Sequence, residues 1–212
     1  DLSDYAQGVV GVARLWANTS AITQFLPGDL ASFVPRHPAI RIELHEHDSS
    51  DVVMVVLDGR ADLGIFADRT PALGLQTQVY RHDRLVLVVP EGHPLAARKR
   101  IPLREAAEYD FVSLSQGTSL AQRLALEAGQ QGMALRVRIQ VRSFDAMCQM
   151  VAAGLGIAVL PVAAAQPLVQ ALGLHKIELD DAWVERELLL GGRDLGSLPR
   201  PARHLLEHLS GA

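Results

Sequence analysis

The chain has 212 residues, of which 49% are hydrophobic and 21% are charged, and its formal net charge is −4 at pH 7. Such a chain is long enough for one large or two small globular domains, and its acidic balance excludes a basic nucleic-acid-binding surface. With a single cysteine, Cys148, it has no intrachain disulfide framework and fits a reducing compartment. No apolar run approaches the roughly 20 residues of a membrane span, so we expect a cytoplasmic protein without a membrane partner.

The first third of the chain predicts two strand-to-helix units. A strand at residues 9–17 leads into a helical pattern that reaches Phe33, in which Pro27 should kink the helix or start it afresh. Residues 40–46 alternate apolar and polar side chains, which is typical of a strand. Residues 52–57 (VVMVVL) are apolar on every side. We predict a helix there because Ser49-Ser50-Asp51 is a start signal, although a buried strand stays an alternative.

The rest of the chain continues the alternation. Further strands are predicted at residues 63–66, 73–80, 85–90, 111–114, 135–141, 157–161, 174–179 and 187–191. Further helices are predicted at residues 102–105, from Ser119 through Ala128, from Ser143 through Ala153, and at residues 201–209. Strands separated by crossover helices indicate an α/β fold with parallel pairing.

Four turns share one chemical character. Residues 18–20, 48–50, 116–118 and 142–143 each carry hydroxyl or amide side chains, and each opens a helix at the carboxyl end of a strand. Helix starts attract anions because their N–H groups lack partners and carry partial positive charge. N-capping alone explains each turn equally well. If the chain forms two facing lobes, however, all four turns point into one cleft, as a clamp for a small anion.

Motifs for catalysis and metal binding are missing from the sequence. It contains no nucleophile elbow, P-loop, complete dinucleotide fingerprint or C-x-x-C pair, and His82-Asp83 has no nucleophile beside it. His45 and His47 could share a strand face with a third metal ligand, although a solvated edge strand is the simpler interpretation. Cys148 lies at helical spacing with Phe144 and Val151, which favours a buried thiol. We therefore expect no enzyme activity, no metal and no cofactor.

Five segments occur in one order over nearly all the chain: FLPGDLASFVPRHPAIRIEL (25–44), GRADLGI (59–65), RLVLVVPEGHPLA (84–96), SFDAMCQMVAAGLGIAVLP (143–161) and ELLLGGR (187–193). Together they resemble the effector-binding domain of a LysR-type transcriptional regulator. The resemblance implies a two-lobe, type 2 periplasmic-binding-protein-like α/β fold with mixed, mostly parallel sheets joined by two crossover strands. Lobe I would comprise residues 1–82 and 188–212, and lobe II residues 83–187. The family's helix-turn-helix is absent, so the sequence is interpreted as a regulatory fragment in which residues 1–7 match the end of a linker helix.

The resemblance also implies a small effector in the inter-lobe cleft, and the polar, uncharged turns suit a carboxylate. Its implied contacts are Asn18, Thr19, Ser20, Ser49, Gln116, Gly117, Thr118, Ser119, Phe144 and Pro161, with Phe66 as a further apolar wall. Some relatives carry an arginine where this chain has Ala67, which leaves Arg142 as the candidate charge partner. A transporter's solute-binding protein and an enzyme on this fold are the alternatives. The sequence upstream of Asp1 would separate the regulator from the solute-binding protein.

The apolar helix at residues 52–57 has more apolar surface than one core can cover, which favours a partner surface. In LysR-type regulators the equivalent helix packs antiparallel on the helix of a second subunit that starts near Ser119 here. The resemblance therefore implies a homodimer in which Val53 and Val56 meet Leu120 and Leu124 of the partner chain, with a tetramer open for the full-length protein. DNA would be contacted only through the missing N-terminal domain.

Overall fold

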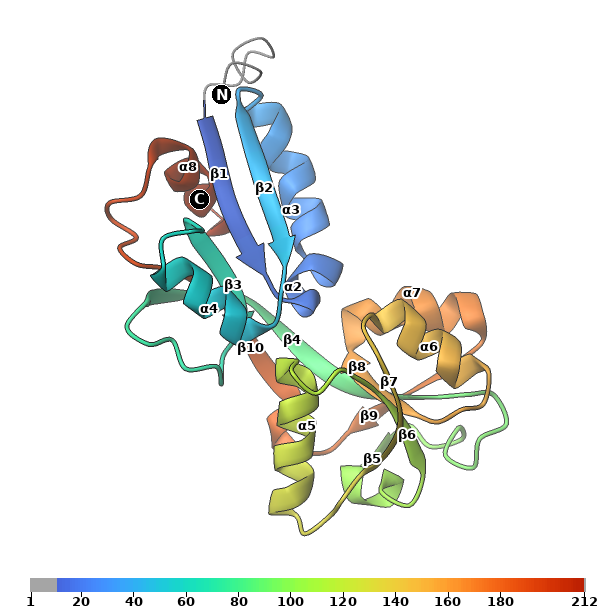
Figure 1. The fold of residues 1–212 in the computed structure, drawn as a ribbon. Helices are drawn as coiled ribbons and strands as arrows, with labels where there is room; N and C mark the ends of the chain where they lie inside the picture. Colours follow the sequence, from blue (N-terminus) through green and yellow to red (C-terminus); the bar gives the residue numbers. More distant parts are fainter. Residues whose placement is uncertain (1–10, 212) are drawn as a thin grey trace. The chain divides into compact units, whose positions relative to one another are not determined.

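The computed structural model describes residues 11–211, and the contacts of the chain divide it into two compact units (Figure 1). Unit 1 comprises Asp1–His82 and Glu187–Ala212, and unit 2 comprises Asp83–Arg186. The chain enters unit 2 within strand β4 (Gln76–Val89) and returns within strand β10 (Glu185–Gly192). Unit 2 is therefore an insertion into unit 1, and two strands carry the chain across the boundary.

Unit 1 is built on strand β1 (Gly11–Ala17), which pairs in parallel with β2 (Ile40–Glu46) on one side and β3 (Leu63–Ala67) on the other. Strand β10 adds to β3 in the antiparallel direction. The helices of this unit are α2 (Thr19–Gln24), α3 (Leu26–Phe33), the 3₁₀-helix η1 (Val34–Arg36), α4 (Ser49–Leu57) and α8 (Arg200–Leu209).

The two-residue period of the strands decides which helix covers which face of this sheet. Ala13 and Leu15 of β1 pack with Phe33 of α3 and Leu205 of α8 in one buried cluster. On the opposite face, Phe66 of β3 packs with the valines of α4. Helices therefore cover both faces, which leaves the carboxyl ends of the parallel strands as the place where polar turns gather.

Unit 2 is organised around the second half of β4. This segment pairs in the antiparallel direction with β8 (Ala158–Pro161) and with β9 (His175–Leu179), and β9 runs parallel to β5 (Arg100–Ile101). Strand β6 (Asp110–Leu114) is parallel to β7 (Arg136–Val141), and a parallel bridge joins Phe111 to Ile157, directly before β8.

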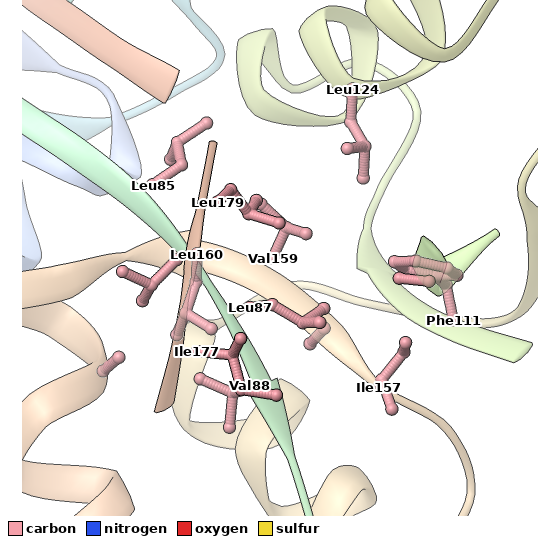
Figure 2. Close-up of a cluster of buried hydrophobic side chains, with 14 of the residues drawn as sticks. Leu85, Leu87, Val88, Phe111, Leu124, Ile157, Val159, Leu160, Ile177 and Leu179 are labelled. Atoms are coloured by element: carbon pink, nitrogen blue, oxygen red, sulfur yellow. The ribbon is translucent and has the colours of Figure 1, made fainter. Parts of the chain in front are cut away.

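The helical segments of unit 2 are η2 (Leu103–Ala106), α5 (Ser119–Gln130), α6 (Phe144–Ala152), α7 (Val162–Leu172) and η3 (Ala182–Val184). Leu87 of β4, Val159 of β8, Ile177 of β9 and Leu124 of α5 belong to one hydrophobic core (Figure 2). This core contains residues of unit 2 alone, so the unit has an apolar interior of its own. None of the helices described is long and apolar enough to cross a bilayer.

Several sequence predictions are confirmed at the level of elements. Residues 52–57 form a helix, α4, and not a buried strand. Pro27 stands in the first turn of α3, so it starts a helix afresh, and the helical stretch ends before His37. Proline is tolerated there because the first N–H groups of a helix have no intrahelical acceptor.

Two predictions are wrong. Residues 73–80 and 85–90 are not two strands but parts of the 14-residue strand β4, which begins only at Gln76. The two predicted strands left residues 81–84 outside either strand, but Asp83 is buried there in an ion pair with Arg186 of β10. The helix α7 was also missed. Its three consecutive alanines give a weak apolar period, and Pro167 in its interior looks like a helix breaker.

Candidate functional site

In unit 1, the turns at residues 18–20 and 48–50 lie next to each other. Strands β1 and β2 end in register at Ala17 and Glu46. The N–H of His47 then donates to the carbonyl of Ala17 (3.1 Å), and the N–H of Asn18 donates to the carbonyl of Ile65 in β3 (3.0 Å). The polar turns after β1 and β2 are therefore held together with the end of β3.

Asn18 and Ser49 link these two turns directly. The Asn18 amide nitrogen donates to Ser49 Oγ (3.2 Å), and Ser49 Oγ also accepts from the N–H of Ala67 (3.1 Å). Asn18 Oδ1 accepts from the N–H of Ala21 (3.0 Å), so Asn18 caps α2. Their exposed fractions are only 4% and 2%. These two side chains thus order the turns, and the capping explanation holds for Asn18.

The accessible hydroxyls of this cluster are those of Thr19, which is half-buried, and Ser50, which is exposed. Thr19 is the one with a side-chain partner at the surface. It donates to Glu46 Oε2 at the surface (2.7 Å). Asp48, the N-cap residue of α4, has its pKa raised by burial and, secondarily, by the charge of Asp51, while His47 acts in the opposite direction. The rim of this cluster therefore carries carboxylates as well as the hydroxyls of Thr19 and Ser50, and the Thr19 proton is already donated to Glu46.

Unit 2 repeats the arrangement with different residues. Strands β6 and β7 end in register at Leu114 and Val141, and the N–H of Ser115 donates to the carbonyl of Val141 (3.0 Å). Thr118 Oγ1 accepts from the N–H of Ala121 (3.2 Å) and caps α5. Ser143 Oγ accepts from the N–H of Ala146 (3.1 Å) and caps α6. The turns at residues 116–118 and 142–143 are therefore neighbours.

The end of β8 adds a third helix start in unit 2 that the sequence did not reveal. Because β8 continues from Ile157, which is bridged in parallel to β6, its carboxyl end has the same direction as those of β6 and β7. Helix α7 begins directly afterwards, with Pro161 as N-cap and no side-chain capping bond. No capping residue marks this start, so an N-cap search could not find it. Pro161 itself was predicted to contribute to the site.

Ser20 is buried (4% exposed) and Ser119 is half-buried. Five further predicted residues fall into two groups. Gln116, Gly117 and Arg142 are exposed, and within the described residues no carboxylate lies at ion-pair distance from Arg142. Phe66 and Phe144, in contrast, are buried in the hydrophobic clusters of units 1 and 2 respectively. Space for the Phe66 ring comes from Gly191, where an added Cβ would lie 2.8 Å from Phe66 Cε1.

The surplus apolar face of α4 is covered by this chain itself, which corrects the reason given for a partner surface. Val53 and Val56 have 0% exposure and pack with Ala61, Phe66 and Leu75 of unit 1. Leu120 and Leu124 of α5 are likewise buried in the core of unit 2. The exposed apolar residues of the two helices are Met54 (47%) and Leu126 (52%).

His45 and His47 pack on a tryptophan. The ring of Trp16 stacks on His47 at 4.0 Å between centroids and lies 5.2 Å from His45. Within residues 11–211, no group of three or more His, Cys, Asp or Glu residues is placed to hold a metal ion. Cys148 is buried in α6, and burial raises the pKa of its thiol to about 11.

Comparisons with known proteins agree on one family. The model of the LysR substrate binding domain matches residues 6–212. The RuBisCO operon transcriptional regulator of Allochromatium vinosum is 25% identical over 183 residues, which are 85% of this chain and 57% of the relative. The probable RuBisCO transcriptional regulator of Trieres chinensis is 24% identical over 195 residues, 88% of this chain and 63% of the relative. The chain thus spans less than two thirds of the length of these relatives.

Solved structures match along nearly the whole chain. The regulatory domain of CcmR from Synechocystis PCC6803, in complex with 2-PG, has a TM-score of 0.86 at 22% identity and covers 95% of this chain and 96% of that one. The effector binding domain of QuiR, in complex with shikimate, has a TM-score of 0.82 at 16% identity, covering 94% and 95%. The BenM effector binding domain with benzoate has a TM-score of 0.79 at 20% identity, covering 96% and 92%.

The fold is that of the effector-binding domains of LysR regulators, a type 2 periplasmic-binding-protein-like α/β fold. The chain belongs to the LysR substrate-binding-domain family of transcriptional regulators. Both curated relatives named above are described as transcriptional regulators.

Proposed function

We propose that this chain is the effector-sensing part of a DNA-binding transcriptional regulator and that its effector is a small carboxylic acid. The observation that carries the proposal is the pairing of polar turns at strand ends in each unit, Asn18–Ser20 with Ser49 and Gln116–Ser119 with Ser143. DNA contact belongs to a part of the regulator outside this chain, in keeping with the greater length of the curated relatives.

The polar helix starts within each unit supply the candidate effector contacts. In unit 2, α5 and α6 are long enough to present unpaired N–H groups to an anion, and the exposed Arg142 adds positive charge beside them. In unit 1, the hydroxyls of Thr19 and Ser50 supply polar contacts, while the carboxylates of Glu46, which accepts the Thr19 proton, and Asp48 disfavour a further negative charge there. The start of α5, whose first turn carries no acidic residue, therefore suits the carboxylate better than the start of α6, whose first turn carries Asp145.

Calorimetry with shikimate, 2-PG and benzoate tests the proposal, since these three compounds are bound by proteins of this fold. For whichever compound binds, Thr19→Val and Thr118→Val should each weaken binding by roughly threefold to tenfold, the usual effect of one lost hydroxyl hydrogen bond. Thr118→Ser keeps both the hydroxyl and the cap of α5 and should bind as the parent does. Thr77→Val is the matched control in unit 1, because Thr77 is exposed on β4, away from these turns.

Unchanged affinity in both valine variants would remove these turns from the effector site. Tight binding of a cationic or wholly apolar compound, without binding of the three acids, would contradict the proposal that the effector is a carboxylic acid.

We further propose that the regulator acts as a homodimer in the cytoplasm, with a tetramer as the larger assembly. Exposed Met54 on α4 and Leu126 on α5, and not the buried valines and leucines, supply the apolar contacts of that dimer.

A further inference from the structure

Unit 1 contains a hollow of about 370 Å³ away from the strand ends described above. It lies where β1 and β2 begin, η1 ends and α8 starts, which is the opposite end of the parallel strands from Asn18 and Ser49. We call it the basic hollow, and its lining residues are Gly11, Arg36, His37, Pro38, Ala39, Ile40, Arg200, Pro201 and His204.

Close packing fixes the walls of the basic hollow. An added Cβ at Gly11 would lie 2.5 Å from Pro201 Cγ, so the absence of a side chain lets the start of α8 approach β1. The ring of His37 stacks on Phe33 at 4.5 Å and lies 4.9 Å from the ring of His204. The carbonyl of His37 accepts from the N–H of Ile40 (3.0 Å). The hollow is therefore built from ordered elements of one unit.

The lining of the basic hollow is positive and contains no acidic residue. Arg36 and Arg200 are exposed, and within residues 11–211 neither has a carboxylate at ion-pair distance. Glu207 is an acidic residue close to these histidines, and its Oε2 lies 4.0 Å from His204 Nδ1. At the start of α8, the N-cap residue Pro199 supplies no side-chain acceptor. In an acidic protein, this end of unit 1 thus concentrates unbalanced positive charge.

Two other hollows show that this imbalance is not a general feature of the surface. A hollow of about 280 Å³ in unit 1 is lined by Arg14 and Arg193, but Asp62 and Asp194 line it too, and Arg14 pairs with Asp62 at 3.0 Å. A hollow of about 460 Å³ beside α5 has no charged residue in its lining. Among these three, the basic hollow alone has arginines in its lining without an acidic residue beside them.

We propose that the basic hollow binds a small organic anion, with the carboxylate held by Arg36 and Arg200 and an apolar body packed on Pro38, Ile40 and Pro201. Guanidinium groups bind carboxylates through charge-assisted, often bidentate hydrogen bonds. A hollow of this volume with mostly apolar walls and a few charged groups is typical of small-molecule sites. The site is independent of the effector contacts proposed above, because it lies at the other end of the strands.

The histidines make this binding depend on pH. The pKa of His37 is lowered by burial, then by the charges of His204, His208 and Arg36, while Glu207 acts in the opposite direction. A bound anion favours the protonated imidazole, so the anion and the proton bind cooperatively. Affinity should therefore rise as the pH falls from about 8 to about 5, the range in which histidine titrates.

The test uses the 212-residue chain with benzoate as probe, benzyl alcohol as its neutral analogue and inorganic phosphate as the second anion. Amide NMR titration should show saturable shifts at Gly11, Ile40 and His204 with benzoate and none with benzyl alcohol. The double variant Arg36→Gln/Arg200→Gln should weaken this benzoate binding by at least about tenfold, because both charge-assisted contacts are lost. The matched control Arg60→Gln/Arg104→Gln removes two exposed positive charges elsewhere and should leave the affinity unchanged.

Three outcomes would overturn the proposal. The first is benzoate shifts that appear only near Thr19, Ser49 or Thr118, or that persist in the arginine double variant. The second is inorganic phosphate binding at Gly11 and His204 while benzoate does not, which would make the hollow a phosphate site. The third is benzoate affinity at this hollow that does not rise as the pH is lowered.

Discussion

Asp83 and Arg186 form a buried ion pair where the two crossover strands enter unit 2. Arg186 Nε and Nη2 donate to the two carboxylate oxygens of Asp83 at 2.8 and 2.5 Å, and both side chains are 1% exposed. The bidentate geometry repays part of the cost of removing both charges from water. The pair therefore holds β4 and β10 together at a fixed register.

Removing one partner of this pair should be far more harmful than removing both. Asp83→Leu should lower the free energy of unfolding by about 3–5 kcal/mol, because it leaves the Arg186 charge buried without its carboxylate. Asp83→Leu/Arg186→Met should recover most of this loss, since an apolar pair of similar volume avoids the desolvation cost. Urea denaturation followed by fluorescence checks both, with Trp16 reporting on unit 1 and Trp183 on unit 2.

The exposed Arg100, paired with Glu178 and Asp180, supplies the control for that experiment. Arg100→Gln should change stability by less than about 1 kcal/mol, because solvent screens surface pairs. A double variant as unstable as Asp83→Leu would contradict our account of the buried pair.

Cys148 should be unreactive in the native protein. Burial, and secondarily the charge of Asp145, raise the pKa of its thiol from 9.0 to about 11, so almost no thiolate exists at neutral pH. Iodoacetamide at pH 8 should label the thiol quickly in urea and very slowly under native conditions, as read by mass spectrometry. The pKa of this thiol is higher in the folded than in the unfolded protein. Its contribution to the free energy of unfolding is therefore fully present below about pH 9 and is lost as the pH rises through about 11. Equal labelling rates in both states would show that the thiol is accessible.

Among the elements, α4 shows how one helix can carry both a core face and a partner face. Its valines are buried within unit 1, and Gly64 of β3 allows their approach, since an added Cβ there would lie 2.6 Å from Val52 Cγ1. Only Met54 projects substantial apolar surface, and on α5 the same is true of Leu126. The proposed dimer therefore depends on a narrow strip of each helix.

Met54→Glu and Leu126→Glu should each shift the protein from dimer to monomer at micromolar concentration without loss of folding, because both side chains are exposed. Val53→Glu should instead unfold the protein, since it buries a charge in the core of unit 1. Sedimentation velocity combined with circular dichroism separates these effects. Leu155→Glu is the matched control, because Leu155 is a 46% exposed leucine outside both helices. If both glutamate variants remain dimers, the interface lies elsewhere.

For the molecule as a whole, the two units differ in how the chain builds them. Unit 2 is one continuous segment, whereas unit 1 needs residues from both ends of the chain. The core of unit 2 contains no residue of unit 1, and Asp83 and Arg186 both lie inside unit 2. Unit 2 therefore has the elements of an independently folding domain of roughly 100 residues.

A fragment of residues 83–186 should fold alone, with dispersed amide resonances and a cooperative urea transition. The corresponding chain without these residues should be less stable than unit 1 in the intact protein, because the deletion cuts β4 short after His82 and β10 short before Glu187. A disordered fragment 83–186 would show that unit 2 depends on unit 1 for its stability.

The sequence by itself determined most elements and the chemical character of the turns. Apolar spacing identified β2 with its bounds, 40–46, and the start signal at Ser49 identified α4 as a helix. These features depend on local preferences, which neighbouring residues encode. The five quoted segments also sufficed to indicate the family to which the chain belongs.

The tertiary structure alone decided which groups meet. The continuity of β4 depends on Arg186, 103 positions from Asp83, and the cover of Val53 comes from Leu75 and Phe66. The basic hollow likewise joins Arg36 to Arg200. No local pattern encodes these pairings, because burial and charge balance depend on residues that are distant in the chain and adjacent only in the folded protein.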